Sequence, residues 1–249
     1  MNIGTGMDIQ NSIVLITGAA IRVGRSIALY LAKKGANIAF SYYLESEPWQ
    51  KTLNEIKDCG VEAVAIQTDI RYADQARAMV KAAMDKFGRI DVLVNSASIW
   101  LKAPFLEISE QDWDTALDVN LKGPFITSQA VARHMLDQKR GVIINITDLS
   151  AFQVWSGYAH HAASKAGLVS ITKTMALELA PYIRVNAIAP GTVLLPDNAS
   201  DEKIKWAVNY SALKRVGSPE DVARLIEFLI ENEFITGSTY FVDGGRSIS

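Results

Sequence analysis

Seven short apolar runs, rich in valine and isoleucine, alternate with longer segments in which apolar residues recur every three or four positions. Most of the runs are almost continuously apolar, which is typical of parallel strands covered on both faces. The alternation predicts a doubly wound, Rossmann-type α/β fold, because right-handed crossovers place helices on both faces of the sheet. The predicted strands are residues 12–17, 37–42, 62–67, 91–95, 141–147, 183–189 and 238–243, and the clearest helical segments are 25–35, 74–88, 128–138 and 164–180.

The alternation runs through the 249 residues without a linker rich in proline, glycine or serine, an internal repeat or a low-complexity stretch. We therefore expect a single domain over residues 1–249. One irregular stretch, residues 191–213, follows the sixth predicted strand. Ligands bind beyond the carboxyl ends of parallel strands, so this stretch is expected to cover a small-molecule substrate.

Composition excludes several functional classes. The chain carries 25 basic and 27 acidic residues without a basic run or an acidic tail, so neither nucleic acid nor a membrane surface is an expected partner. It lacks a membrane-spanning apolar run and a signal-peptide pattern, which predicts a cytoplasmic protein. The single cysteine, Cys59, cannot form a thiolate metal cluster. His160 and His161 are neighbours in the sequence, so their side chains diverge on a helix and do not have the spacing of a metal site.

The first predicted strand leads directly into a turn that contains Gly18 and Gly24, and a helical segment follows. Backbone amides in such a turn and the positive end of the helix dipole bind a pyrophosphate. Two glycines alone are a weak signal, and a plain strand-to-helix turn is the alternative. Ser41, near the end of the second strand, occupies the position where a carboxylate would select NAD(H). Ser41 and Arg22 together favour NADP(H), because the guanidinium of Arg22 suits a phosphate. The alternative for Arg22 is a plain surface charge.

Several motifs resemble those of the short-chain dehydrogenase/reductase family over residues 12–245. The turn Thr17-Gly18-Ala19-Ala20-Ile21-Arg22-Val23-Gly24 resembles its cofactor turn, with Arg22 at the middle glycine as in the pteridine-reductase branch. That branch also has an arginine just beyond the second strand, where this chain has Leu44 and Glu45, so we expect an incomplete phosphate clamp. Further matches are Asp69, Asn95-Ser96-Ala97-Ser98, Asn120, Pro190-Gly191-Thr192, Gly217 to Ala223 and residues 236–245.

The resemblance implies a cofactor site and an assembly. It implies a homotetramer that associates through the helices containing Asn120 and Lys165. The expected NADP(H)-binding residues are Gly18, Arg22, Val23, Gly24, Ser41, Tyr42, Asp69, Ile70, Asn95, Ala97, Ile146, Lys165, Pro190, Gly191 and Thr192.

The catalytic motif departs from the family at one position. Members carry Tyr-x-x-x-Lys on one helix face; here Lys165 is present and His161 stands at the tyrosine position. Asp148, thirteen residues before His161, matches an aspartate of the pteridine branch. An imidazole exchanges protons near neutral pH, so Asp148, His161 and Lys165, with Asn120, are the expected catalytic residues. There are two alternatives. The enzyme is impaired, because imidazole is shorter than phenol, or the histidine has a purely structural role.

Trp100 lies two places beyond the Asn-x-Ala-Ser motif, where the pteridine branch has an aromatic residue that stacks on the pterin. The resemblance implies that Arg22, Ser98 and Asp148 bind the edge of the substrate ring and that Tyr158 forms a pocket wall. It implies NADPH-dependent reduction of a pterin-like or folate-like molecule. A short-chain carbonyl or 3-oxoacyl reductase and a catalytically impaired cofactor-binding protein are the alternatives, and a core or subunit contact is the alternative for Trp100.

Overall fold

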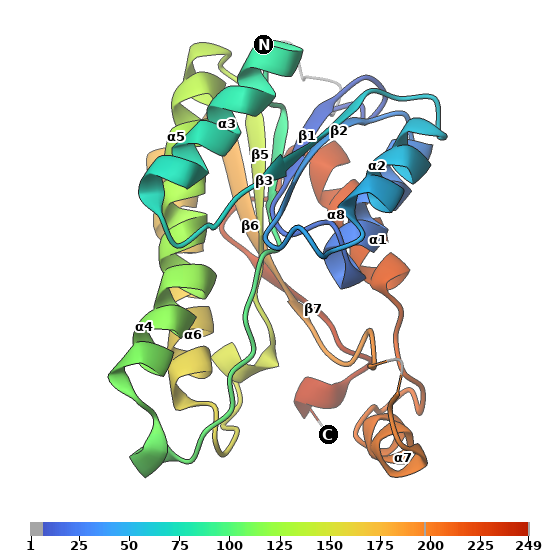
Figure 1. Ribbon diagram of the computed structural model, residues 1–249, viewed down its shortest axis with the longest axis vertical. Helices are drawn as coiled ribbons and strands as arrows, with labels where there is room; N and C mark the ends of the chain where they lie inside the picture. Colours follow the sequence, from blue (N-terminus) through green and yellow to red (C-terminus); the bar gives the residue numbers. More distant parts are fainter. Residues whose placement is uncertain (1–6, 197, 249) are drawn as a thin grey trace.

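The computed structural model describes residues 7–196 and 198–248, in which helices cover both faces of one parallel sheet (Figure 1). All seven predicted strands are present, and each pairs in parallel with its neighbours in the order β3-β2-β1-β4-β5-β6-β7. The prediction of a doubly wound α/β fold is confirmed. The strands are β1 (Ile13–Ile16), β2 (Asn37–Tyr42), β3 (Ala63–Gln67), β4 (Val92–Asn95), β5 (Gly141–Ile146), β6 (Ile183–Pro190) and β7 (Thr239–Val242).

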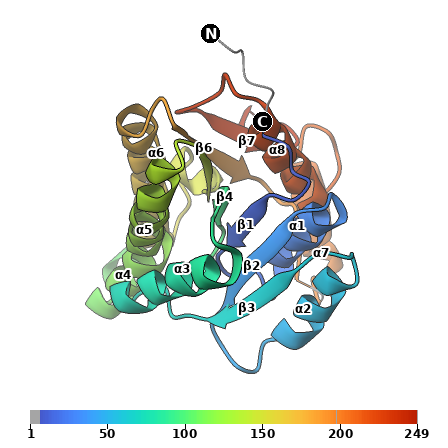
Figure 2. The same cartoon turned by 90° about the horizontal axis from the view of Figure 1, so that it is seen from above.

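The helices form two layers, which Figure 2 shows on opposite sides of the sheet. One layer contains α1 (Arg22–Lys33), α2 (Trp49–Lys57) and α8 (Pro219–Glu231). The other contains α3 (Ala73–Phe87), α4 (Glu110–Leu117), α5 (Gly123–Asp137) and α6 (Ala159–Glu178). Short helical turns are η1 (Phe105–Glu107), η2 (Asp118–Lys122, a π-helix), η3 (Leu149–Ala151) and η4 (Arg246–Ile248). No helix in the described parts of the chain has the length and hydropathy of a membrane span.

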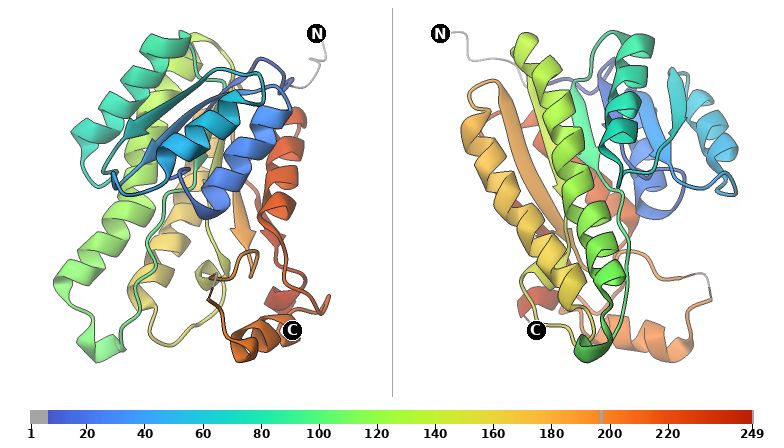
Figure 3. Two further views of the ribbon diagram at one scale, coloured as in Figure 1. Left: turned by 45° about the vertical axis from the view of Figure 1, so that its right-hand side comes forward. Right: turned by 60° about the vertical axis from the view of Figure 1, so that its left-hand side comes forward.

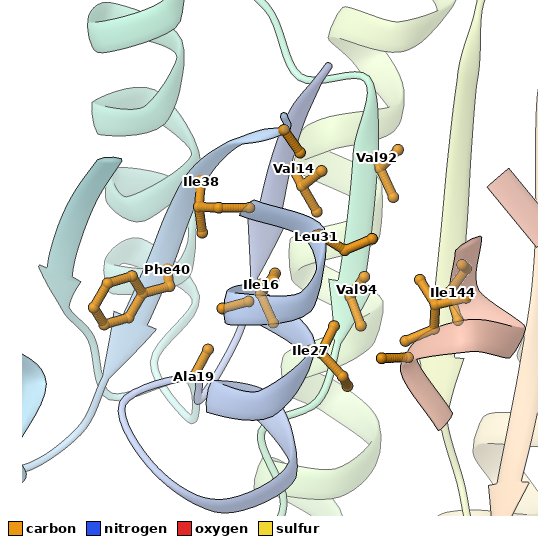
Figure 4. Close-up of a cluster of buried hydrophobic side chains, with 14 of the residues drawn as sticks. Val14, Ile16, Ala19, Ile27, Leu31, Ile38, Phe40, Val92, Val94 and Ile144 are labelled. Atoms are coloured by element: carbon orange, nitrogen blue, oxygen red, sulfur yellow. The ribbon is translucent and has the colours of Figure 1, made fainter. Parts of the chain in front are cut away.

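Apolar side chains of the central strands pack against the buried face of α1, as Figure 4 shows. Ile27 and Leu31 are four residues apart, so both point from α1 to the sheet, where they meet Val14, Ile16 and Val94. These side chains are fully buried. Each one stabilises the fold by about 1.5–3 kcal/mol relative to an exposed position. The strands therefore hold the loops at their ends rigidly.

The expectation that residues 191–213 are irregular is wrong in part, because this stretch contains α7 (Asp201–Asn209). The helix begins at Ser200, whose side chain accepts a hydrogen bond from the backbone N–H of Lys203 at 3.3 Å. Asp201 and Glu202 in its first turn further favour a helix start through the helix dipole. Figure 3 shows α7 beyond the strand ends, beside η4, which is the place expected for a segment that covers a ligand.

Candidate active site

A cavity of about 540 Å³ opens at the carboxyl ends of the strands, where the loops after β1 to β6 meet. It brings together residues that lie up to 172 positions apart in the chain, from Gly18 to Pro190. Fifteen of the predicted site residues line it, and they are Gly18, Arg22, Val23, Gly24, Ser41, Tyr42, Asp69, Ile70, Ala97, Ser98, Trp100, Ile146, Asp148, Lys165 and Pro190. The parallel topology thus places the predicted cofactor and substrate residues around one space.

The turn between β1 and α1 forms one wall of the cavity and requires glycine at position 18. Gly18 has φ +65°, and a Cβ there would lie 2.8 Å from the Cα of Ala97. The hydroxyl of Thr17 accepts hydrogen bonds from the backbone N–H groups of Ser96 and Ala97, both at 3.0 Å, and so joins the turn to the loop after β4. No side chain caps the N-terminus of α1. Its first amides and the tight backbone fit the pyrophosphate of a dinucleotide.

Arg22, the first residue of α1, adopts a left-handed backbone conformation with φ +54°. This conformation costs a non-glycine residue about 1–2 kcal/mol and explains why glycine suits the position. The exposed Arg22 guanidinium makes no ion pair with another described residue and borders the cavity. The strained backbone of Arg22 therefore carries a positively charged side chain at the cavity wall, and this charge is not paired with a described residue.

The end of β2 differs from the sequence expectation in its details. Ser41 is buried, and its hydroxyl accepts a hydrogen bond from the backbone N–H of Gly18 at 3.0 Å, so it supports the glycine turn. Glu45 accepts hydrogen bonds from Tyr42 and Trp49, whose rings stack with centroids 4.8 Å apart. The carboxylate that faces the cavity after β2 is that of Glu47.

His161 and Asp148 form a short hydrogen bond, with His161 Nε2 2.6 Å from Asp148 Oδ2. The second nitrogen, Nδ1, lies 3.1 Å from the carbonyl oxygen of Ile99 and 3.3 Å from the amide nitrogen of Asn120. In the neutral ring, Nε2 donates to Asp148 and Nδ1 accepts from Asn120; in the protonated ring, Nδ1 donates to Ile99. Each protonation state of the imidazole therefore has a partner at both nitrogens.

The predicted relay residues differ in their access to the cavity. His161 is completely buried, whereas the Asp148 side chain retains 15% exposure and lines the cavity wall. Trp100 covers the imidazole with ring centroids 4.4 Å apart. A substrate in the cavity would meet the carboxylate of Asp148 first, with the imidazole of His161 behind it.

Lys165 completes this charged group on the same face of α6. It is almost fully buried, and its Nζ donates to the carbonyl oxygen of Ile146 at 3.0 Å. Burial lowers the pKa of Lys165, and the negative charge of Asp148 partly opposes this effect. Burial raises the pKa of Asp148, but the hydrogen bond from His161 and the charges of Lys165 and His161 outweigh it, so the net pKa is lowered. Asp148 therefore faces the cavity as a carboxylate.

The comparisons with known proteins agree with this geometry. A family model described as enoyl-(acyl carrier protein) reductase matches residues 18–247. The 3-oxoacyl-(acyl carrier protein) reductase of Staphylococcus epidermidis is 40% identical over 241 residues, which cover 95% of this chain and 99% of that protein. A solved short-chain dehydrogenase/reductase from Serratia marcescens has a TM-score of 0.90 at 32% identity, over 96% of this chain and 99% of that one. This chain belongs to the short-chain dehydrogenase/reductase family.

As a short-chain dehydrogenase/reductase, the chain is an oxidoreductase of a family that uses a nicotinamide nucleotide. The reductase of the same 3-oxoacyl name from Synechocystis is 39% identical over 239 residues, covering 94% of this chain and 96% of that protein. These names agree with the carbonyl or 3-oxoacyl alternative of the sequence analysis. They do not support the pteridine-reductase branch that the resemblance of the Arg22 turn implied.

Six predicted site residues of this family member lie outside the cavity lining. Asn95 is buried and donates to Ser128 and Asn145 at 3.0 and 2.8 Å, so it joins strands and helices behind the site. Tyr158 packs against Trp100 with ring centroids 4.9 Å apart, and thus supports the wall from behind. Besides these two, the residues outside the lining are Asn120, His161, Gly191 and Thr192.

The predicted site residues do not include seven polar residues that line the cavity: Tyr43, Glu47, Thr68, Arg71, Ser96, Thr115 and Thr147. Arg71 lies two positions after Asp69, at the strand edge where the other site residues gather, and this position is the signal that could have identified it. No such signal marks Glu47, because the turn after β2 decides which of two nearby carboxylates faces inward.

Proposed function

We propose that this protein is an NADPH-dependent reductase of a carbonyl group in a 3-oxoacyl-type substrate. Four observations support it: the family, the names of the full-length relatives, the free guanidinium of Arg22, and the absence of a carboxylate at Ser41. The observation that carries the chemistry is the Asp148–His161 pair at the cavity wall, whose imidazole has partners in both protonation states.

The residues of the glycine turn and Lys165 would hold the cofactor, which supplies a hydride to the carbonyl carbon when bound. The carbonyl oxygen must then gain a proton. Asp148 faces that oxygen, and His161 Nε2–H donates to Asp148 from behind. When His161 is protonated at both nitrogens, its Nε2 proton passes through the Asp148 carboxylate to the carbonyl oxygen. The ring is then neutral, with Nδ1–H donating to the carbonyl oxygen of Ile99, and a proton from solvent returns through Asp148. Asn120 holds the loop of Ser98 and Ile99, because its Oδ1 accepts from the Ser98 hydroxyl and the Ile99 N–H at 3.0 and 2.8 Å.

NADPH oxidation with a short 3-oxoacyl thioester, dihydrofolate and a dihydropterin tests the substrate class. The proposal predicts turnover of the thioester at a kcat/KM at least about tenfold above that of either pterin, a difference of about 1.4 kcal/mol. The Asp148→Asn variant is the matched control, since it keeps the shape of the cavity. Turnover of the pterins alone would contradict the 3-oxoacyl assignment.

A second candidate substrate, a pterin-like ring, is favoured by Trp100. This residue is 52% exposed and lines the same cavity as Ser98 and Asp148. A flat ring that stacks on this indole gains about 0.5–1.5 kcal/mol beyond its burial. Trp100→Ala should then weaken binding of a pterin analogue by about 1–3 kcal/mol and leave NADPH affinity unchanged. Equal pterin affinity in both forms would exclude this candidate.

A third possibility, a cofactor-binding protein with impaired catalysis, rests on the histidine at the tyrosine position. NADPH binding without turnover of any tested carbonyl or pterin would favour it. The cytoplasmic location and the homotetramer stay predictions from the sequence.

A further inference from the structure

A second arginine faces the expected cofactor cavity. Arg71 follows β3 and is held by Asp69, with Nε 2.9 Å from Oδ1 and Nη2 2.6 Å from Oδ2. Nη2 also donates to the hydroxyl of Tyr43 at 3.1 Å. The guanidinium carbon lies 5.8 Å from the ring centres of both Tyr43 and Tyr72. Contacts from the ends of β2 and β3 thus hold the Arg71 side chain in one orientation.

These contacts leave donor capacity on Arg71. Its Nη1 makes no hydrogen bond or ion pair with a residue in the described parts of the chain, and the side chain is 31% exposed. The hydrogen bond with Asp69 raises the pKa of Arg71 and lowers that of Asp69, so both groups stay charged at neutral pH. A guanidinium carries five N–H donors, so two of them remain for a ligand in the cavity.

We propose that Arg71 binds the 2′-phosphate of NADP(H) together with Arg22, in place of the arginine that this chain lacks at positions 44 and 45. The inference rests on the proposed NADP(H) preference. Both arginines line the same cavity, and the hydrogen bond to Tyr43 places the Arg71 guanidinium near the end of β2. The adenosine ribose of a dinucleotide lies at the end of this strand in this fold. Two charge-assisted donors are stronger than one, and a prepositioned arginine loses little side-chain entropy on binding.

Glu47 is the counter-charge in this part of the cavity. Its Oε1 accepts a hydrogen bond from the backbone N–H of Leu44 at 3.2 Å, so the carboxylate is held near the end of β2. A carboxylate repels a 2′-phosphate and can bind the ribose hydroxyl of NADH instead. The inference therefore requires that Arg22 and Arg71 outweigh Glu47. Glu47→Gln should strengthen NADPH binding several-fold without strengthening NADH binding.

The test is a fluorescence titration of NADPH and NADH against the parent and its variants, with 2′,5′-ADP and 5′-ADP as competing probes. Arg71→Ala should weaken binding of NADPH and 2′,5′-ADP about tenfold and leave NADH and 5′-ADP within about twofold. Arg71→Lys, which keeps one charge, should lie between parent and Arg71→Ala. Tyr43→Phe, which removes an acceptor of Nη2, should cause a smaller loss confined to the phosphorylated ligands.

Two controls make the result specific. Arg71→Ala leaves Asp69 unpaired, and this new negative charge would itself repel a phosphate, so the double variant Arg71→Ala/Asp69→Asn is measured as well. The loss for phosphorylated ligands should persist in it. Arg89→Ala removes another arginine that pairs with an aspartate two positions away, Asp91, but lies outside the cavity lining. It should change none of the affinities, while unchanged NADH binding in each variant reports an intact site.

The outcomes separate this inference from the proposed function. Suppose that the parent prefers NADPH and that Arg71→Ala weakens NADPH and NADH binding by the same factor. This result overturns the inference, because Arg71 would then contact the adenine or ribose. Unchanged NADPH affinity in Arg71→Ala overturns it too. Equal affinities of the parent for NADPH and NADH would instead overturn the NADP(H) preference itself, and the inference with it.

Discussion

His161 stands where the family resemblance leads us to expect a proton-donating tyrosine, but its imidazole is fully buried and lies behind Asp148, which lines the cavity. A phenol is longer than an imidazole. In this site a longer ring would press on the Asp148 carboxylate, which already lies 2.6 Å from Nε2. The histidine thus fits against the aspartate, and under the proposed function we expect the two residues to act as one proton-transfer unit.

The first prediction follows from this pairing. Asp148→Asn and His161→Phe should each lower kcat by about 10²-fold or more, and the double variant should be little worse than either, because residues that act as one unit are not additive. Steady-state NADPH oxidation measures the rates, and cofactor titration should show unchanged affinity. His161→Tyr should also be slower than the parent. A kcat 10²-fold higher in His161→Tyr than in the parent would mean that the histidine impairs the enzyme. Full activity in His161→Phe would mean that His161 only packs in the core.

The second prediction concerns Arg22, whose backbone has a φ of +54°. At this position the effect of a substitution on stability can be measured separately from its effect on cofactor binding. Arg22→Gly and Arg22→Ala both remove the guanidinium and should weaken NADPH binding about tenfold. Only glycine relieves the left-handed strain, so Arg22→Gly should unfold at a higher urea concentration than Arg22→Ala, by about 1 kcal/mol in the free energy of unfolding. Equal stability of the two variants would show that the backbone at position 22 is not strained.

At the scale of elements, α7 is attached to the rest of the site through the C-terminal turn η4. The guanidinium of Arg246 lies 4.7 Å from the ring centre of Trp206 on α7 and 5.2 Å from that of Trp155, which precedes α6. Its Nη1 donates to the hydroxyl of Thr192, in the turn after β6, at 2.9 Å. One side chain therefore joins three separate segments: α7, the loop before α6 and the turn after β6.

We expect Arg246→Gln to loosen α7. Each cation–π contact contributes about 0.5–2 kcal/mol, so their loss should speed proteolysis within residues 198–213 and raise KM for the substrate more than it lowers kcat. Limited proteolysis and steady-state kinetics measure the two effects. Lys205→Gln, which removes an exposed cation from the same helix, is the control. Identical cleavage rates for Arg246→Gln and the parent would contradict the role of Arg246 in holding α7.

The pH dependence of stability is a property of the whole molecule. Three acids have a pKa that a hydrogen bond lowers. Asp69 accepts from Arg71, Asp221 accepts from the backbone N–H of Ser218, and Glu227 accepts from Tyr30. An acid whose folded-state pKa lies below its unfolded value near 4 stabilises the fold above that value. The free energy of unfolding should therefore fall as the pH decreases below about 4. Urea titrations between pH 7 and 3 test this, and Asp221→Asn should show a shallower fall.

Assembly is the other prediction at this scale. The family resemblance implies a homotetramer through the helices containing Asn120 and Lys165. Asn120 lies in η2, which continues directly into α5, and Lys165 lies in α6. Exposed apolar side chains on α5 and α6 include Phe125 and the 82% exposed Leu177. Light scattering should give four times the monomer mass. Phe125→Glu and Leu177→Glu should shift the assembly to smaller species, while a monomeric parent would contradict the prediction. A matched change at Phe234, exposed between α8 and β7, should leave the mass unchanged.

Much of the fold was predictable from the sequence, since the strands are set by local patterns of apolar residues. All seven predicted strands exist, with ends that differ by one residue at most. α2, α4, α7 and α8 were not assigned from the sequence. Three of them begin at a capping serine, such as Ser218, whose hydroxyl accepts from the backbone N–H of Asp221, whereas no side chain caps α2. Fifteen predicted site residues surround one cavity because parallel strands bring their carboxyl ends to one edge.

The sequence by itself therefore determined the strands, the glycine turn and the motif residues, each of which depends on neighbours within a few positions. Only the tertiary structure decided that His161 lies behind Asp148, that Glu47 rather than Glu45 faces the cavity, and that Arg71 borders the end of β2. These outcomes depend on contacts between residues far apart in the chain, such as Arg71 with Tyr43 and His161 with Ile99. The physical reason is that a side chain's depth and partners follow from how the crossovers pack, which no local pattern contains.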